Sequence, residues 1–295
     1  MVLKQLLMSS VALKKNFQCI FIPNYEVQDG KPGIAPPTAL ENALEDCDVL
    51  IYHDIAPYNF PSLLRRLPAD ALTIKIPYIT STIYWPTYSY QTPFGLCPRG
   101  TTSLIPWPCT LLNELIVTLR DKKKILDAYL ETDIPSRLDM RKAYDAQITY
   151  LKAAESGSIF HMAEFVAHNF RDTQLFHLIN HPSLPVFLEV TNTILAHLDL
   201  PLVENFRIDP FATHQIPIHP SIINSYKLSW CDEKTRFQIL DKSFTFEEYV
   251  DFYIDSYIEK YQYTMFPPLN IGKKIRSGAL KRLTAFFSPR GKKNV

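Results

Sequence analysis

The sequence contains little glycine, and its glycines form no phosphate-binding loop. Gly 8 against Pro 23 predicts long, ordered and extended loops rather than flexible linkers. The patterns GxGxxG, GxxxxGK[ST], GxSxG and HExxH are all absent from the sequence. Their absence argues against classical dinucleotide-binding dehydrogenases, P-loop enzymes, ordinary α/β-hydrolases and zincin proteases.

The cysteines suggest neither a disulfide framework nor a zinc site. They are odd in number and scattered, without CxxC or Cys/His ligand spacing, which is typical of free thiols in a reducing compartment. No apolar run reaches the roughly 18 residues that a transmembrane helix needs, and nothing resembles a signal peptide. We therefore expect a cytoplasmic protein and predict no metal site.

Negative charge is missing from the end of the chain. Residues 273–293 hold eight Lys and Arg and no Asp or Glu, so the rest of the chain is net acidic. Apolar residues recur at helical spacing within 271–295. This tail predicts a basic amphipathic helix on an anionic membrane surface, which would place the protein at the inner face of the membrane. A solvated tail is the alternative, and no nucleic-acid partner is expected.

Segments with strand and helix patterns alternate along the chain. The alternation predicts a helix-rich α/β domain over 1–270, with a small, mostly parallel sheet and helices on both faces, followed by the tail 271–295. Such a domain normally opens on a strand, but this chain opens on a helix, so the first strand is expected to be missing. The predicted strands are Phe17–Ile22, Val49–Tyr52, Leu72–Ile76 and Leu175–Ile179, and the predicted helices include 2–14, 111–130, 135–155, 158–169 and 246–261.

The most informative stretch is 171–199. A buried strand, Leu175–Ile179, is followed by the polar turn Asn180-His181-Pro182 and then by an amphipathic helix. Ligands of open α/β sheets bind at such strand ends and helix starts. His181 is therefore a candidate general base, kept largely neutral by the nearby helix N-terminus. A turn that merely caps the helix is the alternative.

Other polar and aromatic residues follow predicted strands. His53 and Asp54 close the strand at 49–52, and Arg171 precedes the key strand, where it could pair with a phosphate. Residues 77–108 form a long loop rich in Tyr, Trp and Pro. A loop of that length inside a compact domain is usually functional, and its position after a strand puts it beside the proposed cleft.

Three segments resemble the WcbI-type capsular polysaccharide biosynthesis family. They are CDVLIYHDIAPYNF (47–60), IKIPYITSTIYWPTY (74–88) and FRDTQLFHLINHPSLPVFLEVTNTILAHL (170–198), and the last carries the family's Asn-His-Pro signature. The family looks like a set of coenzyme A-dependent sugar O-acetyltransferases with a helix-rich α/β fold. It usually begins with a strand ending in a Gly-Asn-Cys-Gln-like turn, whose cysteine looks like the nucleophile or another key active-site group. Met1 falls just after that motif, and no cysteine here matches its place.

The resemblance implies acetyl transfer from acetyl-coenzyme A to a sugar or sugar nucleotide in capsular or surface polysaccharide biosynthesis, without a metal. His181 would take the hydroxyl proton, and Asn180 would orient the hydroxyl or help to hold the oxyanion. Two alternatives stay open: a homologue that binds a nucleotide or saccharide without turnover, and an SGNH-like esterase. The residues expected to bind substrate or cofactor are His53, Asp54, Tyr84, Trp85, Tyr88, Arg171 and Ser183.

Overall fold

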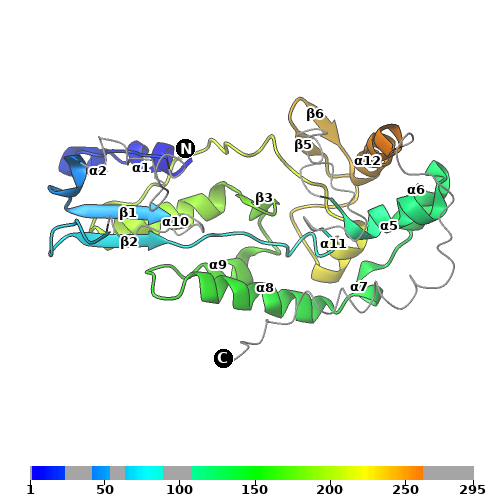
Figure 1. The fold of residues 1–295 in the computed structure, drawn as a ribbon, viewed down its shortest axis with the longest axis horizontal. Coiled ribbons are helices and arrows are strands. Elements are labelled where there is room, and N and C mark those ends of the chain that lie inside the picture. Colours follow the sequence, from blue (N-terminus) through cyan, green and yellow to red (C-terminus); the bar gives the residue numbers. More distant parts are fainter. Residues whose placement is uncertain (1, 24–41, 54–63, 89–107, 262–295) are drawn as a thin grey trace. The chain divides into compact units, whose positions relative to one another are not determined.

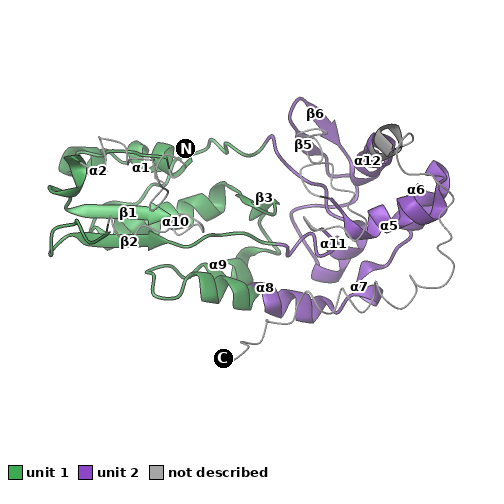
Figure 2. Ribbon diagram, viewed as in Figure 1, with its two compact units in different colours: residues 1–81, 148–212 green, residues 82–147, 213–295 purple. Residues whose placement is uncertain are grey.

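The computed structural model of the chain (Figure 1) describes residues 2–23, 42–53, 64–88 and 108–261. The chain forms two compact units (Figure 2) and passes between them three times. Unit 1 comprises Met1–Ser81 and Ile148–Ala212, and unit 2 comprises Thr82–Gln147 and Thr213–Val295. The single domain over 1–270 stays a prediction, and the tail 271–295 lies outside the described residues.

Unit 1 contains a two-stranded parallel sheet. β1 (Val49–His53) pairs with β2 (Leu72–Ile76) in the register Val49↔Leu72 to His53↔Ile76. Ile74 and Ile76 of β2 are buried, at 1% and 3% exposed, as the alternating apolar pattern predicts. Because the strands are parallel, both carboxyl ends lie at one edge of the sheet, where His53 and Ile76 face each other across the pair.

The helices of unit 1 follow the apolar periodicity of the sequence. The helix predicted over 2–14 is divided into α1 (Val2–Ser9) and α2 (Val11–Asn16), because the Ser10 hydroxyl accepts the Leu13 N–H at 3.2 Å and caps the second helix. α1 packs against α10 (Leu184–His197), and both helices bury an apolar stripe. Two further helices are α9 (Met162–Asn169) and α8 (Met140–Ala154), and the residues of α8 are divided between the two units.

Two sequence predictions for unit 1 are corrected. Residues Phe17–Ile22 form no strand; Ile20 is 52% exposed, so the run does not supply an apolar face that a sheet would bury. The buried run Leu175–Ile179 does not enter a parallel sheet either. Its strand β3 (Phe176–Leu178) pairs antiparallel with β4 (His181–Pro182) across the turn Ile179–Asn180. The backbone groups of this short buried strand thus find partners in the residues that follow it directly.

Unit 2 is helical, with one antiparallel hairpin and an aromatic core. The helices predicted over 111–130 separate at Arg120, which has a left-handed φ of 58°. Lys122 contacts Asp251 and Asp255 at 2.9 and 2.8 Å, so an ion-pair cluster joins two of its helices. The elements are α5 (Thr110–Leu119), α6 (Lys122–Leu130), α7 (Ile134–Arg137), α11 (Pro220–Tyr226), β5 (Phe237–Ile239), β6 (Lys242–Phe244) and α12 (Phe246–Tyr261). The predicted helix-rich α/β fold with a small parallel sheet is confirmed.

Candidate functional site

The β3–β4 hairpin carries Asn180 and His181 and leads directly into α10. Its turn is tied to the segment that follows β2, because the Ser81 N–H, five residues beyond the end of that strand, donates to the Ile179 carbonyl oxygen at 2.8 Å. The carboxyl ends of parallel strands are where ligands bind in open α/β sheets. The predicted strand–turn–helix is therefore a hairpin–helix, linked to the chain that leaves the carboxyl end of β2.

The Asp209 carboxylate holds this hairpin through direct hydrogen bonds, although Asp209 is distant from it in the sequence. Its Oδ2 lies 2.8 Å from His177 Nε2 and accepts the Leu184 N–H at 2.9 Å, while its Oδ1 accepts the Phe211 N–H at 3.1 Å. Partial burial opposes ionisation of Asp209, but the hydrogen bonds from His177 and the two N–H groups outweigh it and lower the pKa of the carboxyl group. Asp209 is thus an ionised acceptor, and His177 Nε2 carries the shared proton.

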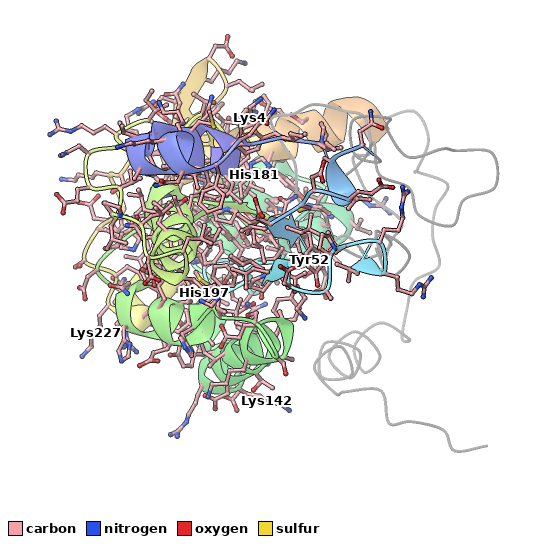
Figure 3. All side chains as sticks on the ribbon, turned by 90° about the vertical axis from the view of Figure 1, so that its left-hand side faces the viewer. Lys4, Tyr52, Lys142, His181, His197 and Lys227 are labelled. Atoms are coloured by element: carbon pink, nitrogen blue, oxygen red, sulfur yellow. The ribbon has the colours of Figure 1, made fainter. Side chains whose placement is uncertain are left out.

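His181 also contacts the loop that carries Asp209, through Phe211. Its imidazole stacks on the Phe211 ring, with centroids 4.2 Å apart and an angle of 20° between the planes. His181 is half-buried, whereas His177 is 4% exposed. Figure 3 labels His181 together with His197 at the last position of α10. The hairpin therefore holds one histidine in a buried contact with a carboxylate and places the other, partly exposed, against an aromatic ring.

The hydrogen-bonding groups at the start of α10 already have partners within the protein. Ser183 is buried and its hydroxyl donates to the Gln174 carbonyl oxygen at 2.5 Å, so Ser183 does not cap the helix. Asp209 accepts the Leu184 N–H, Pro185 has no N–H, and the Val186 N–H donates to the Ser183 carbonyl oxygen at 3.1 Å. These N–H groups are already engaged, and a carboxylate already occupies the positive end of the helix. The Leu184 and Val186 N–H groups at the helix start are therefore not available to a ligand, and the role of Ser183 in binding stays a prediction.

The other predicted residues of unit 1 are placed as follows. His53 ends β1 and packs edge-to-face against the Tyr78 ring, with centroids 6.0 Å apart. Arg171 is exposed, and its guanidinium lies 4.8 Å from the centroid of the Phe170 ring. Asp54 lies outside the described residues. His53 thus shares the carboxyl edge of the sheet with the segment that holds the hairpin.

The three predicted aromatic residues belong to unit 2. Tyr84 and Trp85 are each 1% exposed, and Tyr88 is 8% exposed. The Trp85 indole N–H donates to the Ile216 carbonyl oxygen at 3.2 Å, and Tyr84 packs edge-to-face against Trp230. These side chains fill the core of their unit, which is the usual role of large aromatic residues. Their role in substrate binding stays a prediction.

The described cysteines are thiols at neutral pH. Burial raises the pKa of Cys19, Cys47 and Cys109, and it raises that of Cys231 to about 12. Cys109 is fully buried, with its Sγ 3.3 Å from Thr87 Oγ1 and 3.2 Å from Tyr129 Oη. Because the thiolate is the nucleophilic form, none of these four side chains is an activated nucleophile.

Neither a metal-binding cluster nor a membrane-spanning helix occurs within the described ranges. No group of three or more His, Cys, Asp or Glu side chains there could hold a metal ion. No helix there is both long and apolar enough to cross a membrane. A hollow of about 550 Å³ opens in unit 1 between the α1–α2 junction and residues 201–206. It has the volume of a small-molecule pocket, but neither Asn180 nor His181 lines it.

Asp209 and Phe211 were missed by the sequence analysis. They lie in a proline-containing loop, and His177 and Asp209 are 32 residues apart. Asp-Pro-Phe is also an ordinary loop sequence, so the sequence offers no signal that this loop returns to the hairpin.

Comparison with known proteins identifies the family. A family model described as polysaccharide biosynthesis enzyme WcbI matches residues 3–203. A solved structure of WcbI, described as a novel polysaccharide biosynthesis enzyme, has a TM-score of 0.72 at 17% sequence identity and covers 97% of this chain and 89% of its own. It is described as the native protein without a disulfide bond between coenzyme A and one of its cysteines. No curated protein sequence matches.

The structural likeness shows the fold, a helix-rich α/β protein with a small parallel sheet. The match of the family model extends over most of the chain. The chain belongs to the WcbI family of polysaccharide biosynthesis enzymes.

Proposed function

We propose that this chain is a coenzyme A-dependent O-acetyltransferase that acts on a hydroxyl group of a sugar or sugar nucleotide in capsular or surface polysaccharide biosynthesis. The observation that carries the proposal is the half-buried His181, stacked on Phe211 and adjacent to Asn180 in the hairpin that leads into α10. Membership of the WcbI family supports the polysaccharide pathway. The coenzyme A named with the solved WcbI structure supports the co-substrate.

In this mechanism, His181 accepts the proton of the sugar hydroxyl while the hydroxyl oxygen attacks the thioester carbonyl carbon. A C–O bond forms, the C–S bond breaks, and the departing coenzyme A thiolate receives the proton from His181. Asn180 Oδ1 is buried and has no hydrogen-bond partner among the described residues, so it is the acceptor that would bind a neighbouring hydroxyl of the sugar and so orient the reacting one. A buried amide oxygen without a partner costs about 1–3 kcal/mol, which a bound hydroxyl would recover.

Direct transfer from the thioester to the hydroxyl is the route that the described residues support. A covalent acetyl-enzyme would need a thiolate or an activated hydroxyl. The described cysteines have raised pKa values, and the Ser183 hydroxyl is committed to the Gln174 carbonyl oxygen. Both substrates would then be bound together before the acetyl group moves.

The proposal is tested by incubating the full chain with acetyl-coenzyme A and a panel of monosaccharides and uridine diphosphate sugars. Release of free coenzyme A and formation of acetylated sugar are both measured. Removing a general base lowers kcat by about 100-fold or more, so His181→Gln should show that loss. His197→Gln, an exposed histidine at the end of α10, is the matched control. Wild-type turnover in His181→Gln would exclude this role for His181.

The second candidate function is binding of coenzyme A, a nucleotide or a saccharide without turnover. The raised pKa values of the described cysteines favour it, because the family's expected nucleophile is a cysteine. Calorimetric titration of coenzyme A into the full chain separates the two functions. Binding of coenzyme A without acetylation of any sugar in the panel would favour this second function.

A further inference from the structure

Two exposed tyrosine rings lie beyond the carboxyl end of β2. Tyr78 is 39% exposed, and Tyr150, which belongs to the unit 1 part of α8, is 41% exposed. The Thr80 hydroxyl donates to Tyr150 Oη at 3.1 Å, and the Tyr150 hydroxyl donates to the Tyr78 carbonyl oxygen at 3.3 Å. The Tyr150 hydroxyl is therefore engaged both as donor and as acceptor, so the ring rather than the hydroxyl is what it presents to a ligand.

The Tyr78 ring is also held in place. It packs edge-to-face against His53, the last residue of β1, at an interplanar angle of 76°. Along the extended segment after β2, Ile79 and Ser81 are buried while Tyr78 and Thr80 face outward, which is the alternation of a strand. Burial, and then the neighbouring Tyr150, raise the pKa of Tyr78, so its hydroxyl stays neutral at physiological pH.

This pair of rings is near the proposed reaction centre. The Ser81 N–H binds the Ile179 carbonyl oxygen of the hairpin turn, next to Asn180. Three residues of extended chain, from Tyr78 to Ser81, span about 10 Å at most. That distance is of the order of one or two sugar rings. Tyr78 is therefore joined by a short segment to the hydrogen bond that holds the hairpin turn.

We propose that Tyr78 and Tyr150 form a stacking platform for a pyranose ring of the acceptor sugar. A pyranose presents a face of C–H groups that packs on a flat aromatic ring, while its hydroxyls stay at the rim of that contact. Because both rings are fixed by contacts within the protein, little side-chain freedom is lost on binding. The identification of the ligand as the acceptor rests on the proposed function.

The platform is tested with the methyl glycosides of glucose, galactose and mannose, in the absence of acetyl-coenzyme A. Saturation-transfer NMR on the full chain detects contact with the sugar C–H groups, and titration gives the Kd. Tyr150→Leu and Tyr78→Leu remove one ring each, whereas Tyr150→Phe keeps the ring. Tyr144→Leu, another partly exposed tyrosine of α8, is the matched control.

At least one glycoside should bind, and each leucine variant should weaken that binding about tenfold, since an aromatic stacking contact contributes of the order of one factor of ten. Tyr150→Phe and Tyr144→Leu should bind as the wild type does. Absence of binding by all three glycosides, or unchanged Kd in both leucine variants, overturns the platform. Binding of uridine 5′-monophosphate at these rings, when no glycoside binds there, also overturns the platform. Glycoside binding by a chain that transfers no acetyl group would instead refute only the proposed function.

Discussion

Asp209 and His177 are joined by a 2.8 Å contact between Oδ2 and Nε2, although they are 32 residues apart in the chain. The same oxygen accepts the first N–H of α10, from Leu184. The hairpin strand β3 and the helix that follows the hairpin are thus fixed by one carboxylate. Its other oxygen holds Phe211, the ring on which His181 stacks.

Asp209→Asn should therefore disturb the position of the His181 ring indirectly, through Phe211. The amide nitrogen replaces one of the two oxygens, so it faces either the N–H groups of His177 and Leu184 or the N–H of Phe211. A buried donor left unpaired costs about 1–3 kcal/mol. The loss should appear as a lower urea midpoint of unfolding at neutral pH. Asp199→Asn, an exposed residue with a left-handed φ of 53° that asparagine tolerates, serves as control.

The difference in stability between wild type and Asp209→Asn should also depend on pH. The folded-state pKa of Asp209 lies below its usual value of 3.8, so its contribution is present above that value and is lost as the pH falls through the lower folded pKa. The two unfolding midpoints should converge in strong acid. A difference that persisted unchanged into that range would contradict the ionised Asp209.

Phe211→Leu should release the His181 ring while leaving the Asp209 hydrogen bond to the backbone of residue 211 in place. Stacking against Phe211 predicts upfield-shifted ring protons for His181 in the NMR spectrum, and the leucine variant should return them toward ordinary histidine positions. Stacking contributes about 0.5–1.5 kcal/mol, so the fold should persist. Phe187→Leu, whose ring lies 5.9 Å from that of Phe211, should leave the His181 signals in place.

His219 should make unit 2 sensitive to mild acid. Its Nε2 lies 3.0 Å from the Tyr129 carbonyl oxygen, and its Nδ1 accepts the Ser221 N–H at 3.1 Å, an arrangement that requires the neutral ring. Burial lowers the pKa of His219 below 6.5 despite the contact with Tyr129. The folded state is therefore fully favoured above about pH 6.5 and loses this contribution as the pH falls toward the lower folded pKa.

His219→Asn should weaken that pH dependence. Asparagine can still accept the Ser221 N–H at the start of α11 but does not titrate, so the decline of the free energy of unfolding between about pH 7 and pH 5 should be shallower. Urea unfolding followed at several pH values measures the slope. His168→Asn, at an exposed position in α9, should retain the wild-type slope.

Cys109 should be replaceable by serine but not by alanine. Its sulfur caps α5 by accepting the Leu112 N–H at 3.5 Å and contacts the hydroxyls of Thr87 and Tyr129. Alanine removes the cap, which costs about 1 kcal/mol, and leaves two buried hydroxyls without their partner. Thermal unfolding of the two variants should place serine well above alanine. Cys19→Ala, at a half-buried thiol, is the control.

The basic tail carries a separate proposal, that residues 271–295 bind an anionic membrane surface. The full chain should sediment with vesicles that contain phosphatidylserine, and a chain ending at residue 270 should not. Binding should weaken as salt is raised, because the attraction is electrostatic. Equal sedimentation of both chains would refute this role of the tail.

Sequence patterns located the elements whose apolar residues repeat regularly. β1, β2, α10 and α12 follow from period and length, and the family resemblance pointed to the hairpin residues Asn180 and His181. The antiparallel pairing of β3 with β4 was missed because a short buried run has no period that separates one sheet type from another. Asp209 was missed because its contacts depend on how a distant loop returns. Tyr84 and Trp85 illustrate a further limit, since an aromatic-rich segment looks the same in sequence whether it lines a pocket or fills a core.

The three crossings of the chain between units also govern how the protein can be made and divided. Unit 1 is incomplete until Ala212 has been synthesised, because its second stretch runs from Ile148 to that residue. The strands β1 and β2 are therefore synthesised long before α10 and the Asp209 loop, which belong to the same unit. An expression fragment that ends at Ser81 would carry part of unit 1 alone, and one that ends at Gln147 would carry part of each unit. Contacts of such long sequence separation also slow folding, so the nascent chain exposes apolar α1 and β2 surfaces for longer than a contiguous domain would.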